Sequence, residues 1–360
     1  MPLQTEIKFS RSGVQHKLVP HRSKINNKVV TDMAYQIDQH GNVTLGSHVV
    51  PIPRTISPEA QAVLATAPTD VNEGGKLKPA WASRAAVDAQ MQQINQFARS
   101  LFPVDIEETR VGGVRCHWVR PLQMPTENKG KLLINMHAGS FVLGSGALAE
   151  AIPIAHLTRV PVLSIDYRLA PEHPFPAAVD DIVAVYRAML EQYKPSSIGI
   201  FGTSAGGFLT GQTAMRLQHD GLPLPACLGM FTSGGDLSDF GDTAQIYTLM
   251  GFYGELLLPV DHELSEIRAY RGNTAAKDPL FSPLYGDLAH FPPTLLVSGT
   301  RDLVLSSAST FHRALRRAGA DADLFVFDAM AHGFWYAVHL PESREALDIM
   351  TRFFLKHLAQ

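Results

Sequence analysis

The chain has 360 residues, of which 45% are hydrophobic, and a formal net charge of −3. This length and apolar content suffice for one large domain with a buried sheet and a smaller addition. The charge argues against a polyanionic partner such as nucleic acid, and no apolar run approaches the ~20 residues of a membrane-spanning helix.

The two cysteines, Cys116 and Cys227, lie in apolar, strand-like surroundings. Buried free thiols are expected there rather than a disulfide, which suits a reducing compartment. No charged segment followed by an apolar stretch marks a secretion signal at the N-terminus. We therefore expect a cytoplasmic protein.

The first hundred residues divide into two parts. Residues 1–32 are polar and basic and lack apolar periodicity, which predicts a flexible or non-native extension, with Met33 as the natural start. Residues 83–102 place apolar side chains at helical spacing and predict an amphipathic helix.

From about residue 104 onward, apolar runs alternate with helical patterns. This alternation is typical of an α/β domain with a mostly parallel sheet, and residues 104–108 and 114–120 predict an antiparallel edge. Later strands are predicted at residues 131–136, 160–165, 198–201, 226–231, 294–297 and 324–327. Helices are predicted at about 177–193 and 344–358.

The strand predicted at 131–136 leads into a loop of small residues, His137-Ala138-Gly139-Ser140-Phe141. Small residues let backbone N–H groups face a substrate, which is how an oxyanion is stabilised in acyl transfer. A turn built for close packing is the alternative.

The sequence Gly202-Thr203-Ser204-Ala205-Gly206 directly follows the apolar run at 198–201. A serine flanked in this way by glycines, on a tight turn between a strand and a helix, is typical of a nucleophile elbow. Ser204 is thus the candidate nucleophile, and the N–H of Ala205 is a candidate oxyanion donor. The helix that follows directs its positive end at the site where negative charge develops.

A serine nucleophile needs a base that is oriented by a carboxylate. Asp302 follows the strand at 294–297, and His332 follows the strand at 324–327, so both lie where chemistry gathers in parallel sheets. Asp328 is a rival carboxylate, and a helix cap is the alternative role for Asp302. His332 precedes Phe334 and Trp335, an aromatic pair that we expect to wall the cleft.

In three segments the chain resembles the hormone-sensitive lipase family of bacterial esterases, within the α/β-hydrolase superfamily. These are the loop from His137 to Ser140, the run Asp-Tyr-Arg-Leu-Ala-Pro-Glu at 166–172, and the elbow, here in a GTSAG variant. The similarity covers about residue 104 to the C-terminus.

The resemblance implies an α/β-hydrolase fold with a helical cap. Ser204, Asp302 and His332 would form the catalytic triad, and Gly139, Ser140 and Ala205 would supply the oxyanion N–H groups. In the run at 166–172, we expect Arg168 and Glu172 to tie down the loop.

A cap would be formed by residues 33–103, with helices near 236–270, over a catalytic domain at 104–360. Its expected pocket walls are Tyr247, Met250, Phe252, Tyr253 and residues 256–258. Ordinary helix core is the alternative for each of these side chains.

The chain departs from the family pattern in two segments. Ala138 and Ser140 stand where the family usually has glycine, so the loop is expected to be stiffer or re-aimed, because alanine and serine reach positive φ less readily. Thr203 stands where most members have aspartate, which should alter the field around His332 and the pH dependence.

The implied activity is hydrolysis of short- to medium-chain carboxylic esters through an acyl-enzyme, with no metal or organic cofactor. The expected partner is a small-molecule ester, with a homo-oligomer left open. Amide or lactone hydrolysis would use the same triad. A receptor that binds a small molecule without turnover is the alternative from another class, and fold analogy alone does not exclude it.

Overall fold

The computed structural model describes residues 35–38, 40, 42–45, 48–66 and 79–358. The predicted extension at 1–32 lies outside the described residues. The helices and strands discussed below all belong to the unit that begins at Tyr35.

An eight-stranded sheet forms the centre of this unit, with the strand order β11-β10-β9-β8-β6-β7-β5-β4. The strands are β4 (Val104–Val111), β5 (Val114–Pro121), β6 (Leu132–Met136), β7 (Val162–Ile165), β8 (Ile198–Thr203), β9 (Cys227–Phe231), β10 (Thr294–Gly299) and β11 (Ala322–Phe327). Six of them, from β6 to β11, run parallel. The α/β fold predicted from the alternation of apolar runs and helical patterns is confirmed.

Every residue of β6, β8, β9 and β10 is buried. Strands that are covered by helices on both faces of a parallel sheet need apolar side chains on both sides, which explains their continuous apolar runs. By contrast, β4 and β5 pair antiparallel at the sheet edge, as predicted, and half of the residues of β4 are exposed.

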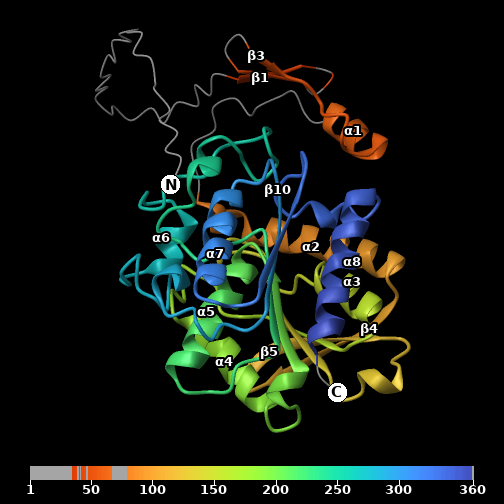
Figure 1. Ribbon diagram of the computed structural model, residues 1–360, viewed down its shortest axis with the longest axis vertical. Helices are drawn as coiled ribbons and strands as arrows, with labels where there is room; N and C mark the ends of the chain where they lie inside the picture. Colours follow the sequence, from red (N-terminus) through yellow and green to blue (C-terminus); the bar gives the residue numbers. More distant parts are fainter. Residues whose placement is uncertain (1–34, 39, 41, 46–47, 67–78, 359–360) are drawn as a thin grey trace, which may run out of the picture. The chain divides into compact units, whose positions relative to one another are not determined.

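Helices cover both faces of the sheet (Figure 1). The helices of this layer are α3 (Ala151–Thr158), α4 (Ala177–Met189), α5 (Ala205–His219), α7 (Leu305–Arg317) and α8 (Pro341–His357). Apolar residues of α4, α5 and α7 belong to one buried cluster, and those of α3 and α8 to a second one on the opposite face. The two clusters pack on opposite faces of the sheet and thereby hold in place the strand ends that carry the candidate site.

The predicted amphipathic helix at 83–102 is present as α2 (Arg84–Leu101), preceded by a 3₁₀ helix at Ala80–Ser83. Farther upstream lie α1 (Pro58–Ala65) and a small antiparallel sheet, β1 (Tyr35–Ile37), β2 (Val43–Leu45) and β3 (His48–Val50), none of which was predicted. Three-residue strands carry too little periodicity to be recognised in a sequence.

The region 236–270 is less helical than expected. Its helices are a 3₁₀ turn, Asp242–Gln245, and the start of the six-residue α6 (Glu266–Arg271); turns and isolated bridges fill the interval between them. Gly241, Gly251 and Gly254 adopt positive φ in this stretch, which interrupts helix propagation. Short 3₁₀ helices also occur at Thr126–Asn128, Pro195–Ser197, Pro283–Tyr285 and Phe334–Tyr336.

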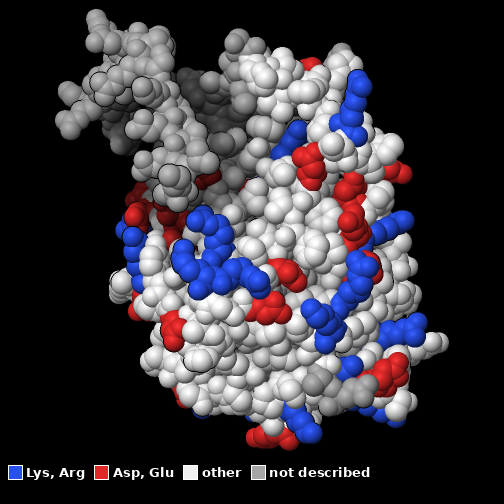
Figure 2. Space-filling model, viewed as in Figure 1, with Lys and Arg blue, Asp and Glu red and all other residues white. Residues whose placement is uncertain are grey.

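Charged side chains of both signs lie close together on the face shown in Figure 2, with wide uncharged surface around them. Among the described residues, no helix is long and apolar enough to cross a membrane. Cys116 and Cys227 are both buried free thiols, as predicted, and burial raises the pKa of each to about 12.

Candidate active site

Ser204 lies at the turn between β8 and α5 with φ 55° and ψ −121°, a conformation that non-glycine residues rarely adopt. Its N–H donates to the carbonyl of Phe231 at 2.8 Å, which holds the turn against β9. A Cβ at Gly206 would lie 1.9 Å from the carbonyl oxygen of Met136, so only glycine fits there. Ser204 thus lies on a tight, strained turn between a strand and a helix.

Ala205 is the first residue of α5. The first N–H groups of a helix have no acceptor within the helix, and they carry its positive partial charge. The N–H of Ala205 is therefore available for an anionic oxygen beside Ser204.

The loop after β6 turns sharply at Gly139, which has φ 131° and whose carbonyl accepts from the N–H groups of Val142 and Leu143 at 3.0 and 2.9 Å. A Cβ at Gly139 would lie 2.2 Å from the carbonyl oxygen of Leu143. Ser140 follows with φ 51°. Glycine is retained where no side chain fits, and serine occupies the left-handed conformation next to it.

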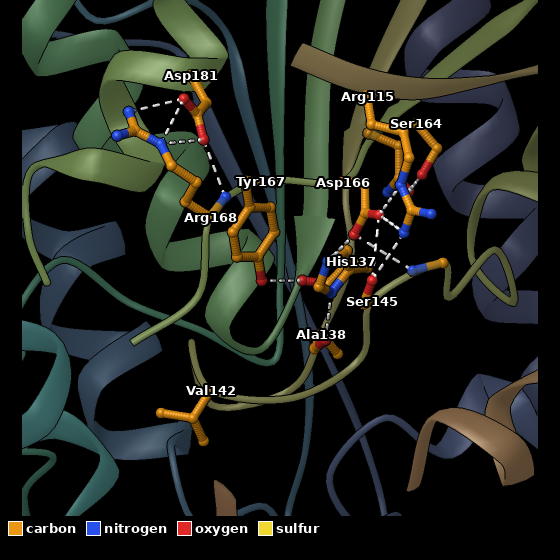
Figure 3. A network of polar contacts seen from close by, with 12 residues as sticks. Arg115, His137, Ala138, Val142, Ser145, Ser164, Asp166, Tyr167, Arg168 and Asp181 are labelled. Atoms are coloured by element: carbon orange, nitrogen blue, oxygen red, sulfur yellow. Dashed lines mark hydrogen bonds and ion pairs between the residues drawn. The ribbon is translucent and has the colours of Figure 1, made fainter. Parts of the chain in front are cut away.

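Two neighbouring residues, Asp166 and Tyr167, support this loop with polar contacts (Figure 3). The Tyr167 hydroxyl donates to the carbonyl of His137 at 2.8 Å, and the two rings stack with centroids 4.2 Å apart. Asp166 forms an ion pair with Arg115 and accepts from the Ser145 hydroxyl at 3.1 Å. The run at 166–172 therefore supports the loop that carries Gly139 and Ser140.

Arg168 and Glu172 do anchor their loop, but each with a different partner. Arg168 pairs with Asp181 of α4, as Figure 3 shows, with a shortest distance of 2.8 Å. Glu172 pairs with Arg84 at the start of α2, through two hydrogen bonds of 3.0 Å.

The structure brings Asp302 and His332 together, with 2.8 Å between Oδ1 of the carboxylate and Nδ1 of the imidazole. Asp302 is fully buried, and it also accepts from the Ser298 hydroxyl at 2.7 Å and from the N–H of Val304 at 3.1 Å. These contacts fix the carboxylate. The last contact lies just before α7, whose N-cap is Val304, so Asp302 is not itself the helix cap.

The Nε2 atom of His332 is buried and has no hydrogen-bond partner among the described residues. Because Nδ1 faces Asp302, Nε2 is the ring atom left to exchange a proton with another group. His332 and Ser204 line the same pocket.

Asp328, the rival carboxylate, faces elsewhere. It accepts hydrogen bonds from the hydroxyls of Thr55 and Thr300, the second at 3.2 Å. The structure thus selects Asp302 as the carboxylate beside His332.

Apolar side chains dominate the pocket that contains Ser204 and His332. It is also lined by Ser140, Phe141, Ala205, Phe208, Phe240, Leu249, Leu257, Glu266, Ile267, Leu303 and Val304. Burial raises the pKa of the Glu266 carboxyl in this setting. Among the pocket walls predicted near 247–258, only Leu257 takes part.

The expectation that Phe334 and Trp335 wall the cleft is wrong. Both belong to the buried cluster on the α3 and α8 face of the sheet, where Phe334 packs on Phe327 and Trp335 on Phe231. A sequence does not reveal to which face of the sheet the chain turns after His332.

Sequence reasoning missed Glu150, which lies directly before α3 and is only 6% exposed. Its carboxylate accepts hydrogen bonds from Asn135, Ala138, Thr203 and Tyr336. Burial raises the pKa of Glu150 to about 7 in spite of these bonds. The one available signal was an acidic residue inside an otherwise apolar stretch, residues 147–155.

The Thr203 hydroxyl is buried, and it lies close enough to the Glu150 carboxylate and the Tyr336 hydroxyl to lower the pKa of both groups. The Glu150 carboxylate lies 3.1 Å from the backbone nitrogen of Thr203. The elbow therefore has a carboxylate beside it, although the residue before Ser204 is uncharged. In the described part of the chain, no cluster of three or more His, Cys, Asp or Glu residues is arranged to hold a metal ion.

A family model described as the alpha/beta hydrolase fold matches residues 133–336. The chain belongs to this family. Its relatives include an acetyl-hydrolase of Streptomyces hygroscopicus, which is 33% identical over 68% of this chain and 80% of the relative, and an esterase of Acinetobacter venetianus, which is 30% identical over 74% and 88%.

Solved structures agree with this assignment to the α/β hydrolases. The crystal structure of an esterase superposes with a TM-score of 0.77 at 36% identity, over 88% of this chain and 99% of the other. An esterase from the bacterial hormone-sensitive lipase family superposes with a TM-score of 0.64 at 28% identity, over 79% and 100%. The resemblance to that family is confirmed, and this α/β hydrolase is an enzyme of the carboxylesterase and lipase type.

Proposed function

We propose that this α/β hydrolase cleaves short- to medium-chain carboxylic esters with Ser204 as nucleophile, His332 as proton carrier and Asp302 as its orienting carboxylate. One observation carries the proposal. His332 is held by Asp302 through Nδ1, its Nε2 is buried without a partner among the described residues, and the same pocket exposes Ser204.

In the first half-reaction, the Ser204 oxygen attacks the ester carbonyl while its proton passes to Nε2 of His332. The carbonyl oxygen becomes an oxyanion, for which the N–H groups of Gly139, Ser140 and Ala205 are the proposed donors. One such donor is worth about 10²- to 10³-fold in rate. Collapse of the intermediate releases the alcohol, which takes the proton from His332 and leaves an acyl-serine.

In the second half-reaction, His332 takes a proton from water as the water oxygen attacks the acyl-serine. The new oxyanion uses the same N–H donors. The Ser204 oxygen leaves with the proton from His332, and the carboxylic acid is released. Asp302 stabilises the imidazolium that forms in both halves.

Acyl chains are proposed to lie among Phe208, Phe240, Leu257 and the other apolar side chains of the pocket. Burial of methylene groups against apolar side chains has a favourable free energy. The S. hygroscopicus relative bears the name acetyl-hydrolase, which favours the short end of the range. Residues 33–103 and 236–270 are proposed to act as the cap that limits acyl length.

The test is hydrolysis of p-nitrophenyl esters of increasing acyl length by wild type and by Ser204→Ala, purified side by side. We expect turnover by wild type and its loss in the variant. The acyl length at which the rate falls then measures the pocket.

Turnover that survives in Ser204→Ala would contradict the proposed nucleophile. A folded wild-type protein without turnover at any acyl length would contradict ester hydrolysis. Amide and lactone hydrolysis would pass through the same acyl-serine as ester hydrolysis. Parallel assays with anilides and lactones would then distinguish them, by turnover, from binding without turnover.

A further inference from the structure

The carboxylate of Glu150 accepts four hydrogen bonds close to the candidate active site, although Glu150 does not line the pocket. Its Oε1 accepts from the backbone N–H of Ala138 at 2.9 Å and from the Tyr336 hydroxyl at 2.6 Å. Its Oε2 accepts from the backbone N–H of Thr203 at 3.1 Å and from the Asn135 amide at 3.2 Å.

Three of these donors belong to the three segments that carry the proposed active-site groups. Ala138 directly precedes Gly139 and Ser140, Thr203 directly precedes Ser204, and Tyr336 lies four residues after His332. We propose that Glu150 is a positioning residue, whose ionised carboxylate ties the oxyanion loop, the nucleophile elbow and the histidine loop to one another. This inference rests on the proposed function, because it assigns those segments their roles.

The number and direction of the bonds favour the ionised form. A carboxylate offers about four lone-pair positions and no donor, and four donors occupy them here. The N–H groups of Ala138 and Thr203 cannot reverse their direction. The Asn135 amide is held as well, because its oxygen accepts from the Ser164 hydroxyl at 3.0 Å.

Protonation of Glu150 therefore introduces a hydrogen where a donor already points. Of the four donors, only the Tyr336 hydroxyl can rotate to accept it, at the cost of its own donation; the nearby Thr203 hydroxyl is the other group that can accept. Reversal of the Tyr336 hydrogen bond changes the tie to the loop that carries His332. The geometry thus links one proton on Glu150 to the relative placement of Ser204 and His332.

The environment allows this proton to bind near neutral pH. Burial raises the pKa of Glu150 to about 7, and its four hydrogen bonds offset only part of that cost. The ionisable groups that act on it from neighbouring elements are the phenols of Tyr336 and Tyr167, both of which stay neutral because burial raises their pKa values. Burial and hydrogen bonds to neutral donors are the largest causes of the shift in the pKa of Glu150.

The test compares the pH profiles of kcat/KM for wild type, Glu150→Gln and Tyr336→Phe, on a short-chain p-nitrophenyl ester. In Glu150→Gln, we expect kcat at pH 8 to fall about 10- to 100-fold with little change in KM, because Glu150 does not line the pocket. The acid limb should lose one ionisation in this variant.

Glu150→Gln removes one ionisation from the acid limb of the pH profile, whereas Tyr336→Phe should shift that limb to higher pH. Removing one donor weakens the ionised form of Glu150, so its pKa rises and the limb shifts to higher pH. Glu150→Asp keeps a carboxyl group, so the second ionisation should return in part to the acid limb of its kcat/KM profile. Glu191→Gln, an exposed glutamate in the turn after α4, is the matched control and should keep the wild-type profile.

A fluorophosphonate that labels Ser204 provides a second readout that needs no ester turnover. If wild type is labelled and the Glu150→Gln profile matches that of wild type, the role of Glu150 is overturned while the nucleophile stands. If wild type neither turns over esters nor becomes labelled, the proposed function fails, and the role of Glu150 with it. If Glu150→Gln does not fold, Tyr336→Phe decides: an unshifted acid limb overturns the proposal.

Discussion

Asp302 and Asp328 follow the carboxyl ends of the neighbouring strands β10 and β11, and their hydrogen bonds distinguish their roles. Asp302 is fully buried and bonded to His332, whereas Asp328 is bonded to Thr55 and Thr300. An aspartate that holds an imidazole fixes which ring nitrogen carries the proton.

Asp302→Asn is therefore expected to lower kcat by about 10⁴-fold, because an amide stabilises the wrong tautomer of His332 and does not balance the imidazolium. Asp328→Asn is the matched control, at a carboxylate that follows the neighbouring strand, and should keep kcat close to wild type. The measurement is kcat on p-nitrophenyl acetate for both variants. Equal losses in the two variants would contradict the assignment of Asp302.

At the scale of elements, α2 is joined to the candidate site by its first residue. Arg84 donates to the carbonyls of Val142 and Ala170, each at 2.9 Å, and to the carboxylate of Glu172. A positive charge is unfavourable at the N-terminus of a helix. We infer that these bonds, which reach the loop after β6 and the run at 166–172, offset that disadvantage.

Arg84→Ala is expected to lower the free energy of unfolding by about 1–3 kcal/mol, because the carbonyls of Val142 and Ala170 lose their donors. Glu172→Ala should cost only about 0–1 kcal/mol, since that side chain is half exposed and its ion pair is screened by solvent. Urea denaturation of both variants measures the difference. Similar losses would show that the ion pair, rather than the carbonyl contacts, secures α2.

The elements that were predictable are those with local signals. The buried strands are short apolar runs, and the elbow, the loop at 137–140 and the positions of Asp302 and His332 follow from residues next to those runs. Glu150 could not be found in this way, because Tyr336 is 186 residues away and Thr203 is 53 residues away. Such contacts exist only after the sheet has assembled. The direction taken by Phe334 and Trp335 depends on the same assembly.

For the molecule as a whole, the protonation state of Glu150 that favours the folded state differs from the one that our proposal assigns to catalysis. The pKa of its carboxyl is about 7 in the folded protein, compared with about 4.5 when exposed to water. The folded state therefore binds this proton more tightly than the unfolded chain does. The contribution of Glu150 to stability is fully present below about pH 4.5 and is lost as the pH rises through 7. Our proposal assigns the opposite preference to catalysis, which needs the ionised form.

We expect the free energy of unfolding of wild type, relative to Glu150→Gln, to decrease by at most about 3 kcal/mol between pH 5 and pH 8. The glutamine has no proton to lose, so the comparison cancels the titration of other groups that both proteins share. The measurement is urea unfolding of both proteins at a series of pH values. A difference that stays constant across this range would mean that folding does not raise the pKa of Glu150. A decrease that coincides with the rise in wild-type kcat would show that one ionisation both strains the fold and activates the site.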